Sequence, residues 1–363
     1  MKKRRKYFVL LLLFVCMVAL LGCTRERTID KISIIHVFGF DQADNGDLMG
    51  TASIPEYTKN KAGTQIEYLE EQAPSSGLVI SKMGTHTSTP VELAKTRVLV
   101  FGKSYAEAGI QNMVERFIIT PQLGTNIQIA VSTQSARETL NKFRKRKSLT
   151  LLEQIEHNML KQNLPTMNLH IFLNHFYGEG MDAFVPMISL DEKDTIKVDG
   201  VGVFKNDKFK LHLNPKQTTL FSILKDYRSQ AALSMYLGEH NPSEIISVRA
   251  FRSHSNWDWD QKKKELNLNL LLKWTIIQHP DRFKLEKKKD IIEIKKLITK
   301  NIEKGIEDLL TTLKENEVDP LGLGNIVRSK DRTWERESFY KQYPTLPINV
   351  NVDLEIIHSG LES

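Results

Sequence analysis

The chain is poor in cysteine: only two occur among its 363 residues, and both, Cys16 and Cys23, lie near the N-terminus. A disulfide framework, a thiol redox pair and a cysteine-ligated zinc site each need two or more cysteines in the folded part of a protein. The sequence therefore excludes all three beyond residue 23. A chain of this length can bury enough apolar surface to be stabilised by its core alone.

The chain also has little excess charge once its first residues are set apart. It carries 51 Lys and Arg against 44 Asp and Glu, a balance that would by itself suggest a nucleic-acid partner. Five of these basic residues form the cluster at residues 2–6, so 46 remain against the 44 acidic residues. We therefore expect no nucleic-acid partner. A lysine-rich run remains at 262–300, and its helical spacing indicates a solvated face suited to anionic headgroups.

The first 23 residues have the pattern of an export signal. The basic cluster at 2–6 precedes an uncharged apolar run at 7–21, which is shorter than the roughly 20 residues that a membrane-spanning helix needs. The run ends in Leu20, Leu21, Gly22 and Cys23, which resembles a lipobox, the bacterial signal at which a cysteine is lipidated. We expect cleavage after residue 22 and lipidation of Cys23. An uncleaved signal anchor and a plain signal peptide are the alternatives.

The first half of the remaining chain predicts an α/β region. A hairpin is expected from residues 32–40 and 48–54, because Asn45 and Gly46 form a strong turn signal between them. Residues 56–90 are polar and predict one short helix between loops. Further strands are expected at 97–102, 126–131 and 184–188, with helices at 105–117, after Thr150 and around 169–176.

The second half predicts a compact α+β domain. Strands are expected at 198–204, 209–213, 245–251, 266–274 and 348–356, the last two with strict apolar and polar alternation. Between them, residues 291–313 place an apolar side chain every three or four positions and predict a long amphipathic helix. We predict an α+β fold of several domains, three in number, with a C-terminal antiparallel sheet packed against that helix. The expected boundaries are a leader at 1–22, an N-terminal region at 23–195, divisible into two subdomains, and a C-terminal domain at 196–363.

The search for catalytic or metal-binding patterns finds none. The sequence contains no G-x-S-x-G, H-E-x-x-H or Rossmann glycine pattern, so we expect no enzyme, no cofactor and no metal site. His170 and His175 lie five residues apart, which turns them about 140° from each other on a helix, and we interpret both as surface or boundary residues. Trp257 and Trp259 are interpreted either as an exposed patch for a partner or as part of a hairpin turn.

Several motifs resemble those of a known family. The stronger ones are Asp-Gly-Val-Gly-Val-Phe-Lys at 199–205 and Asp-Pro-Leu-Gly-Leu-Gly at 319–324; 98–102, 164–166, Trp334, Tyr340 and Gly360 support them. Together with the lipobox and the first hairpin, their order resembles that of the germinant-receptor C-subunit lipoproteins of endospore-forming bacteria. The resemblance covers almost the whole mature chain. Members often carry Trp-Asp directly after the lipidated cysteine, where this chain has Thr24 and Arg25.

The resemblance implies a non-catalytic lipoprotein that acts in spore germination. Such a protein lies on the outer face of the inner spore membrane, held by acyl chains (palmitate among them) on Cys23. It acts with a membrane-embedded A subunit and a transporter-like B subunit in sensing nutrients. We also predict that Gly322 and Gly324 are backbone-turn positions after the long helix, because glycine tolerates positive φ.

Two other classes of protein are weighed against this one. A solute-binding lipoprotein that delivers a nutrient to a membrane transporter would have two similar α/β lobes around a cleft. An exported hydrolase would assemble a catalytic site from residues distant in the sequence. The antiparallel alternation of the second half favours the receptor subunit over both.

Overall fold

The computed structural model describes residues 32–357, apart from 57–64, 94, 121–122, 125, 144–150, 162–163, 226–231 and 238–241, and also describes Arg4 and Tyr7. Two large sheets organise these residues, one of eight strands and one of four. A two-stranded parallel pair, β1 (Ser33–Ile34) and β5 (Val91–Glu92), accompanies the first sheet.

The eight-stranded sheet has the order β10-β9-β8-β7-β6-β2-β3-β4. Its strands are β2 (Val37–Gln42), β3 (Leu48–Glu56), β4 (Gln65–Ala73), β6 (Val98–Gly102), β7 (Gln128–Ser132), β8 (Phe184–Leu190), β9 (Ile196–Lys205) and β10 (Lys208–Leu213). The four central strands pair in parallel, and antiparallel strands extend the sheet at both edges. Every residue of β6 and β7 is buried, as expected of parallel strands covered on both faces.

Helices cover both faces of this sheet. They are α2 (Ser76–Met83), α3 (Lys103–Ala108), α4 (Gln111–Ile118), α5 (Ala136–Phe143), α6 (Leu151–Leu160) and α7 (Leu169–Phe176), and α8 (Pro215–Lys225) follows the last strand. On one face, Val98 and Val100 pack with Leu140 of α5 and Ile155 of α6. The other face belongs to a larger core, which continues into the C-terminal sheet.

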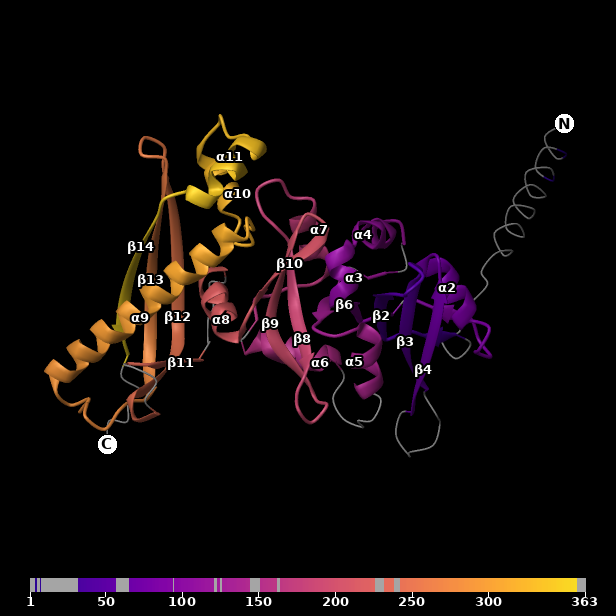
Figure 1. Ribbon diagram of the computed structural model, residues 1–363, viewed down its shortest axis with the longest axis horizontal. Coiled ribbons are helices and arrows are strands. Elements are labelled where there is room, and N and C mark those ends of the chain that lie inside the picture. The colour runs from indigo at the N-terminus through magenta and orange to yellow at the C-terminus, as the bar shows by residue number, and fades with distance from the viewer. Residues whose placement is uncertain are drawn as a thin grey trace.

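The C-terminal sheet has the order β11-β12-β13-β14. Its strands are β11 (Ala232–Tyr236), β12 (Ile245–Asp260), β13 (Glu265–Gln278) and β14 (Ile348–Ile356). The long helix α9 (Lys288–Glu315) lies across one face of it (Figure 1). The alternating leucines of β13 are buried, as are the isoleucines that recur along α9. Two shorter helices, α10 (Leu323–Lys330) and α11 (Arg336–Gln342), connect α9 to β14.

The molecule is elongated. Strands β3 and β4 lie toward one end of its long axis, β8 to β10 lie in the middle, and the four-stranded sheet with α9 lies at the other end (Figure 1). The α+β fold with several sheets and a C-terminal sheet packed against one long helix is therefore confirmed. The predicted boundary at residue 195 falls between β8 and β9, which pair with each other in one sheet.

Several local features differ from the predictions. Residues 56–90 contain the strand β4 before the predicted helix. The helix predicted at 105–117 is two helices, because the chain turns at Gly109 with a φ of 126°. Strand β12 continues through Trp257 and Trp259 to Asp260, so these tryptophans lie in a strand and not in a turn. Finally, β14 runs parallel to β13, because α9 carries the chain back along the sheet before β14 begins.

Candidate functional site

The motif at residues 319–324 builds a buried junction between the two sheets. The chain leaves α9 through Glu317, whose φ is 55°, and then buries Val318 and Asp319. The Asp319 carboxylate caps α10: one oxygen accepts the backbone N–H of Leu323 at 2.8 Å and the other accepts that of Gly324 at 2.8 Å. Because the first N–H groups of a helix have no partner within it, this aspartate satisfies two of them.

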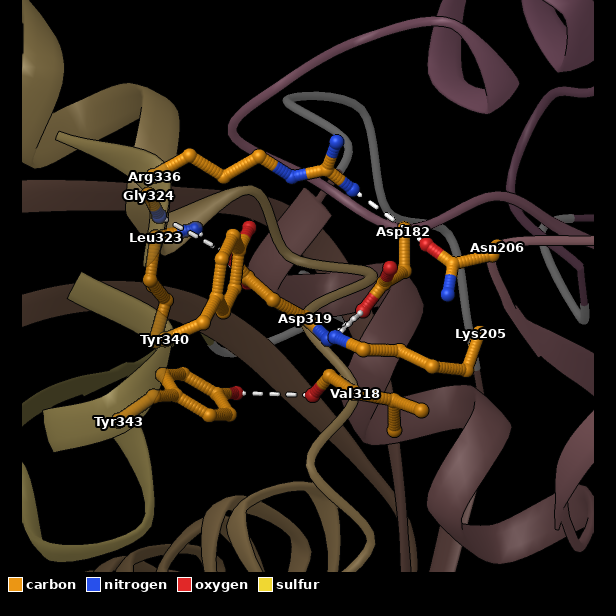
Figure 2. Close-up of polar contacts among 10 residues, drawn as sticks. All are labelled: Asp182, Lys205, Asn206, Val318, Asp319, Leu323, Gly324, Arg336, Tyr340 and Tyr343. Atoms are coloured by element: carbon orange, nitrogen blue, oxygen red, sulfur yellow. Dashed lines mark hydrogen bonds and ion pairs between the residues drawn. The ribbon is translucent and has the colours of Figure 1, made fainter. Parts of the chain in front are cut away.

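Asp182, just before β8, joins this motif to the middle of the molecule. Its backbone N–H donates to the Asp319 carbonyl at 2.9 Å, and its carboxylate accepts the Asp319 backbone N–H at 2.7 Å. Lys205, at the end of β9, donates to the same carboxylate oxygen at 3.1 Å (Figure 2). The two aspartates are 137 positions apart in sequence and bind each other through backbone as well as side chain.

Two tyrosines donate hydrogen bonds to the chain segment around Asp319 and complete the junction. Tyr340 of α11 donates its hydroxyl to the Asp319 carboxylate at 3.2 Å, and Tyr343 donates to the Val318 carbonyl at 2.9 Å (Figure 2). The ammonium group of Lys205 lies 4.5 Å from the centroid of the Tyr340 ring, within range of a cation–π contact. The junction is thus made of residues from β9, the loop before β8, the turn after α9, and α11.

Burial dominates the electrostatics of the junction. Burial, with a smaller contribution from the neighbouring Asp182, raises the pKa of Asp319 to about 7, despite the three donors that favour the charged form. Burial also raises the pKa of Asp182, against the opposing effect of Lys205. Tyr340 and Tyr343 have raised pKa values for the same reason and remain protonated donors. Asp319 has no solvent exposure, so its position suits a structural contact rather than reaction with a substrate.

Two glycines allow the close approach at this junction. The N–H of Asn325 donates to the carbonyl of Gly180 at 2.9 Å, and a Cβ on Gly180 would lie 2.6 Å from that nitrogen. A Cβ on Gly324 would lie 2.9 Å from the Tyr340 hydroxyl and 3.0 Å from the Gly180 carbonyl oxygen. The turn role predicted for Gly322 agrees with its φ of 77°. Gly324 lies inside α10 without positive φ, and its glycine serves close packing instead.

The other residues singled out from sequence have varied positions. Cys23 lies outside the described residues. His170 is exposed as predicted, but His175 is buried against the Phe184 ring, so the surface or boundary interpretation is wrong for it. Burial, with a smaller contribution from the positive charge of Lys225, lowers the pKa of His175 to about 4. Trp257 and Trp259 are partly buried and pack against the larger core, so they do not form an exposed patch.

Among the described residues, no group of three or more His, Cys, Asp or Glu side chains is arranged to hold a metal ion. Within the same ranges, no helix combines the length and apolar character needed to cross a bilayer. An open hollow of about 940 Å³ lies beside the β2–β3 turn, with Asp47, Tyr105 and Arg116 among its lining residues. It lies on the N-terminal side of the molecule and not between the two sheets.

Part of the junction is visible in the sequence. The motif around Asp319 and the strand ending at Lys205 stand out there, and Tyr340 belongs to the same set of family-like positions. Asp182 carries no local signal, because its role depends on a partner far along the chain.

Known families and proteins match this chain over almost its whole length. Residues 25–190 match the family described as "Spore germination protein N-terminal domain", and residues 199–360 match "Spore germination B3/ GerAC like, C-terminal". The spore germination protein GerQC of Bacillus cereus is 26% identical over 97% of this chain and 98% of its own. Spore germination protein KC of Bacillus subtilis (strain 168) is 21% identical over 99% of this chain and 97% of its own.

A solved structure supports the fold independently. The crystal structure of the GerBC protein superimposes with a TM-score of 0.59 at 13% identity, covering 88% of this chain and 96% of that one. At this identity the likeness concerns the fold, and the two family matches together extend from residue 25 to residue 360. The chain therefore belongs to the Ger(x)C family, the C subunits of nutrient germinant receptors, and has a role in spore germination.

Proposed function

We propose that this chain is a non-catalytic, lipid-anchored subunit of a nutrient germinant receptor. It is cleaved after residue 22, lipidated at Cys23 and held on the outer face of the inner spore membrane. There it assembles with the integral-membrane A and B subunits. The lipobox supports the anchor, and the family membership supports the complex.

The observation that carries the non-catalytic part of the proposal is the Asp182–Asp319 junction. The most distinctive sequence motif of the chain connects one sheet to the other. It does so through one backbone–backbone hydrogen bond, one hydrogen bond from a backbone N–H to the Asp182 carboxylate, and a capped helix. A receptor subunit that transmits or supports a change between partners needs such a fixed relation between its parts. A catalytic group must reach a substrate, whereas both carboxylate oxygens of Asp319 are buried and occupied by hydrogen bonds within the chain.

The solute-binding alternative fits the geometry less well. It requires two similar lobes around a cleft, whereas the two sheets here have eight and four strands and different orders. The open hollow beside the β2–β3 turn belongs to the N-terminal region alone. Direct capture and delivery of a nutrient by this chain is therefore the second candidate.

The anchor is tested by replacing Cys23 with alanine in the sporulating host. Wild-type chain should enter the detergent phase, and its N-terminal peptide should carry the mass of an acylated cysteine. Cys23→Ala should accumulate as an unprocessed precursor and should reduce germination through the receptor. Cys16→Ala is the matched control, because this cysteine lies in the part that is removed. A wild-type chain that is freely soluble and not acylated would contradict the proposal.

A further inference from the structure

The first turns of α9 carry a basic patch that the fold itself does not require. Residues 284–300 contain seven lysines against three acidic residues, whereas residues 301–317 contain two lysines against five acidic residues. We define the basic patch as Lys287, Lys288, Lys289, Lys296 and Lys300, together with Ile292. The basic half of the helix therefore ends where the acidic half begins.

The lysines of the patch are solvent-exposed, and none forms an ion pair with another residue that the structure describes. Nearby cations are paired: Arg282 contacts Glu244 and Glu293, and Lys295 lies 3.7 Å from Asp353. Within the ranges that the structure describes, no acidic side chain lies within ion-pair distance of Lys287, Lys288 or Lys289. These lysines are consequently available to an external anion.

The position of the patch is unfavourable for the helix. Lys287 is the N-cap of α9 and forms no side-chain cap, and Lys288 and Lys289 follow it directly. The N-terminal end of a helix carries partial positive charge, so adjacent cations are repelled there. Three lysines at this end weaken the helix and concentrate positive potential, which points to a role outside the fold.

An apolar side chain lies within the patch. Lys289, Ile292, Lys296 and Lys300 recur every three or four residues, on the face of α9 away from buried Ile294 and Ile298. Ile292 is 59% exposed. Lysines that flank an exposed isoleucine on one helix face match the requirements of an anionic bilayer surface, where lysines meet headgroups and the apolar group enters the interface.

We infer that the basic patch docks the C-terminal domain on anionic lipid headgroups. The start of α9 lies at the far end of the molecule from β3 and β4 (Figure 1), so contact there would lay the elongated chain along the bilayer. The inference rests on the proposed lipid anchor only for bringing the chain to the membrane.

The test is lysine acetylation followed by mass spectrometry on the full, lipid-anchored chain in vesicles. One set contains phosphatidylcholine alone, and the other contains phosphatidylcholine with phosphatidylglycerol. Patch lysines should react several-fold more slowly on the anionic vesicles. The exposed Lys262, Lys263 and Lys264, in the β12–β13 turn, should react equally on both. High salt should abolish the protection, because it screens exposed charges.

Matched triple variants separate the patch from a general charge effect. Changing Lys287, Lys288 and Lys289 to glutamine should weaken the contact on the order of 100-fold and restore reactivity at Lys296. The same change at Lys262, Lys263 and Lys264 should leave protection intact. Equal reactivity of the wild-type patch on both vesicles would overturn the inference, as would protection seen only in the assembled receptor, which would indicate a protein partner. Failure of the chain to float with vesicles would instead count against the anchor.

Discussion

Replacing Asp319 with asparagine should remove a pH-dependent part of the stability. Burial raises the pKa of Asp319 from 3.8 to about 7, so the folded chain holds this proton more tightly than the unfolded chain. The contribution to stability is then fully present below the unfolded value and is lost as pH rises through the folded value. Wild-type chain should accordingly lose stability from this group between about pH 4 and 7.

The pKa of Asp319 sets the size of the effect. A rise of about three pH units at about 1.4 kcal/mol each gives an upper bound of about 4 kcal/mol. Asparagine cannot ionise and can accept only one of the two backbone N–H groups of Leu323 and Gly324. Relative to the protonated aspartate, asparagine should therefore cost about 1–3 kcal/mol in lost hydrogen bonding, and this part of the cost does not change with pH. The stability advantage of wild type over Asp319→Asn should therefore decrease as pH rises from 5 to 8, with most of the decrease below pH 7.

Urea denaturation followed by tryptophan fluorescence is a suitable assay. All four tryptophans lie between residues 257 and 334, so the signal reports on the C-terminal half and its junction. His175 has a lowered pKa and gives an opposite pH dependence, but it is present in both chains and cancels in their difference. Asp331→Asn is the control, because hydrogen bonds from Thr333 lower the pKa of Asp331 and keep it charged throughout this range.

An advantage of wild type over Asp319→Asn that stays constant from pH 5 to 8, or that grows with pH, would refute this reasoning. It would mean that the three donors outweigh burial and that Asp319 is ionised throughout. The same result from Asp331→Asn as from Asp319→Asn would show that the effect is not specific to the junction.

Three further predictions concern the same region. Gly322→Ala should lower the thermal unfolding midpoint and cost about 1–2 kcal/mol, because its φ of 77° is unfavourable for alanine; Gly77→Ala, with no atom near the added Cβ, should be neutral. Lys205→Met should destabilise the chain to urea by about 2 kcal/mol, less than for a fully buried pair because Lys205 is 28% exposed, and an unchanged urea midpoint would mean that Asp182 needs no cation. The stability of wild type relative to His175→Phe should rise between about pH 4 and 6.5, since the folded state keeps this histidine neutral; a difference between the two chains that does not change with pH would contradict this.

Much of the fold could be predicted from periodicity. The alternation along β13 and β14 and the spacing of isoleucines along α9 indicated the right elements, because one face of each is buried in a single core. The direction of each strand and the order of strands in a sheet do not follow from periodicity. Apolar and polar residues alternate in the same way in a parallel and an antiparallel strand, so the sequence does not indicate that β14 is parallel to β13. Strand β4 was missed because it lies at a sheet edge, where polar side chains such as Glu67 and Gln72 meet solvent.

Less of the junction than of the fold can be predicted from the sequence. The turn at Gly322 follows from glycine chemistry, and the motif around Asp319 was visible. The use of Asp319 as a helix cap and its contact with Asp182 depend on tertiary structure. His175 was misjudged for the same reason, since its burial comes from contact with Phe184 and not from its place on α7.

The central claim, that this chain works as a subunit of a membrane receptor, is tested most directly by affinity purification from spore membranes. A tagged chain expressed at its natural level should copurify with two integral-membrane proteins, the A and B subunits, after mild detergent extraction. The Cys23→Ala chain should lose them, and Cys16→Ala should retain them. A wild-type chain that is recovered alone, or from the soluble fraction, would contradict the account.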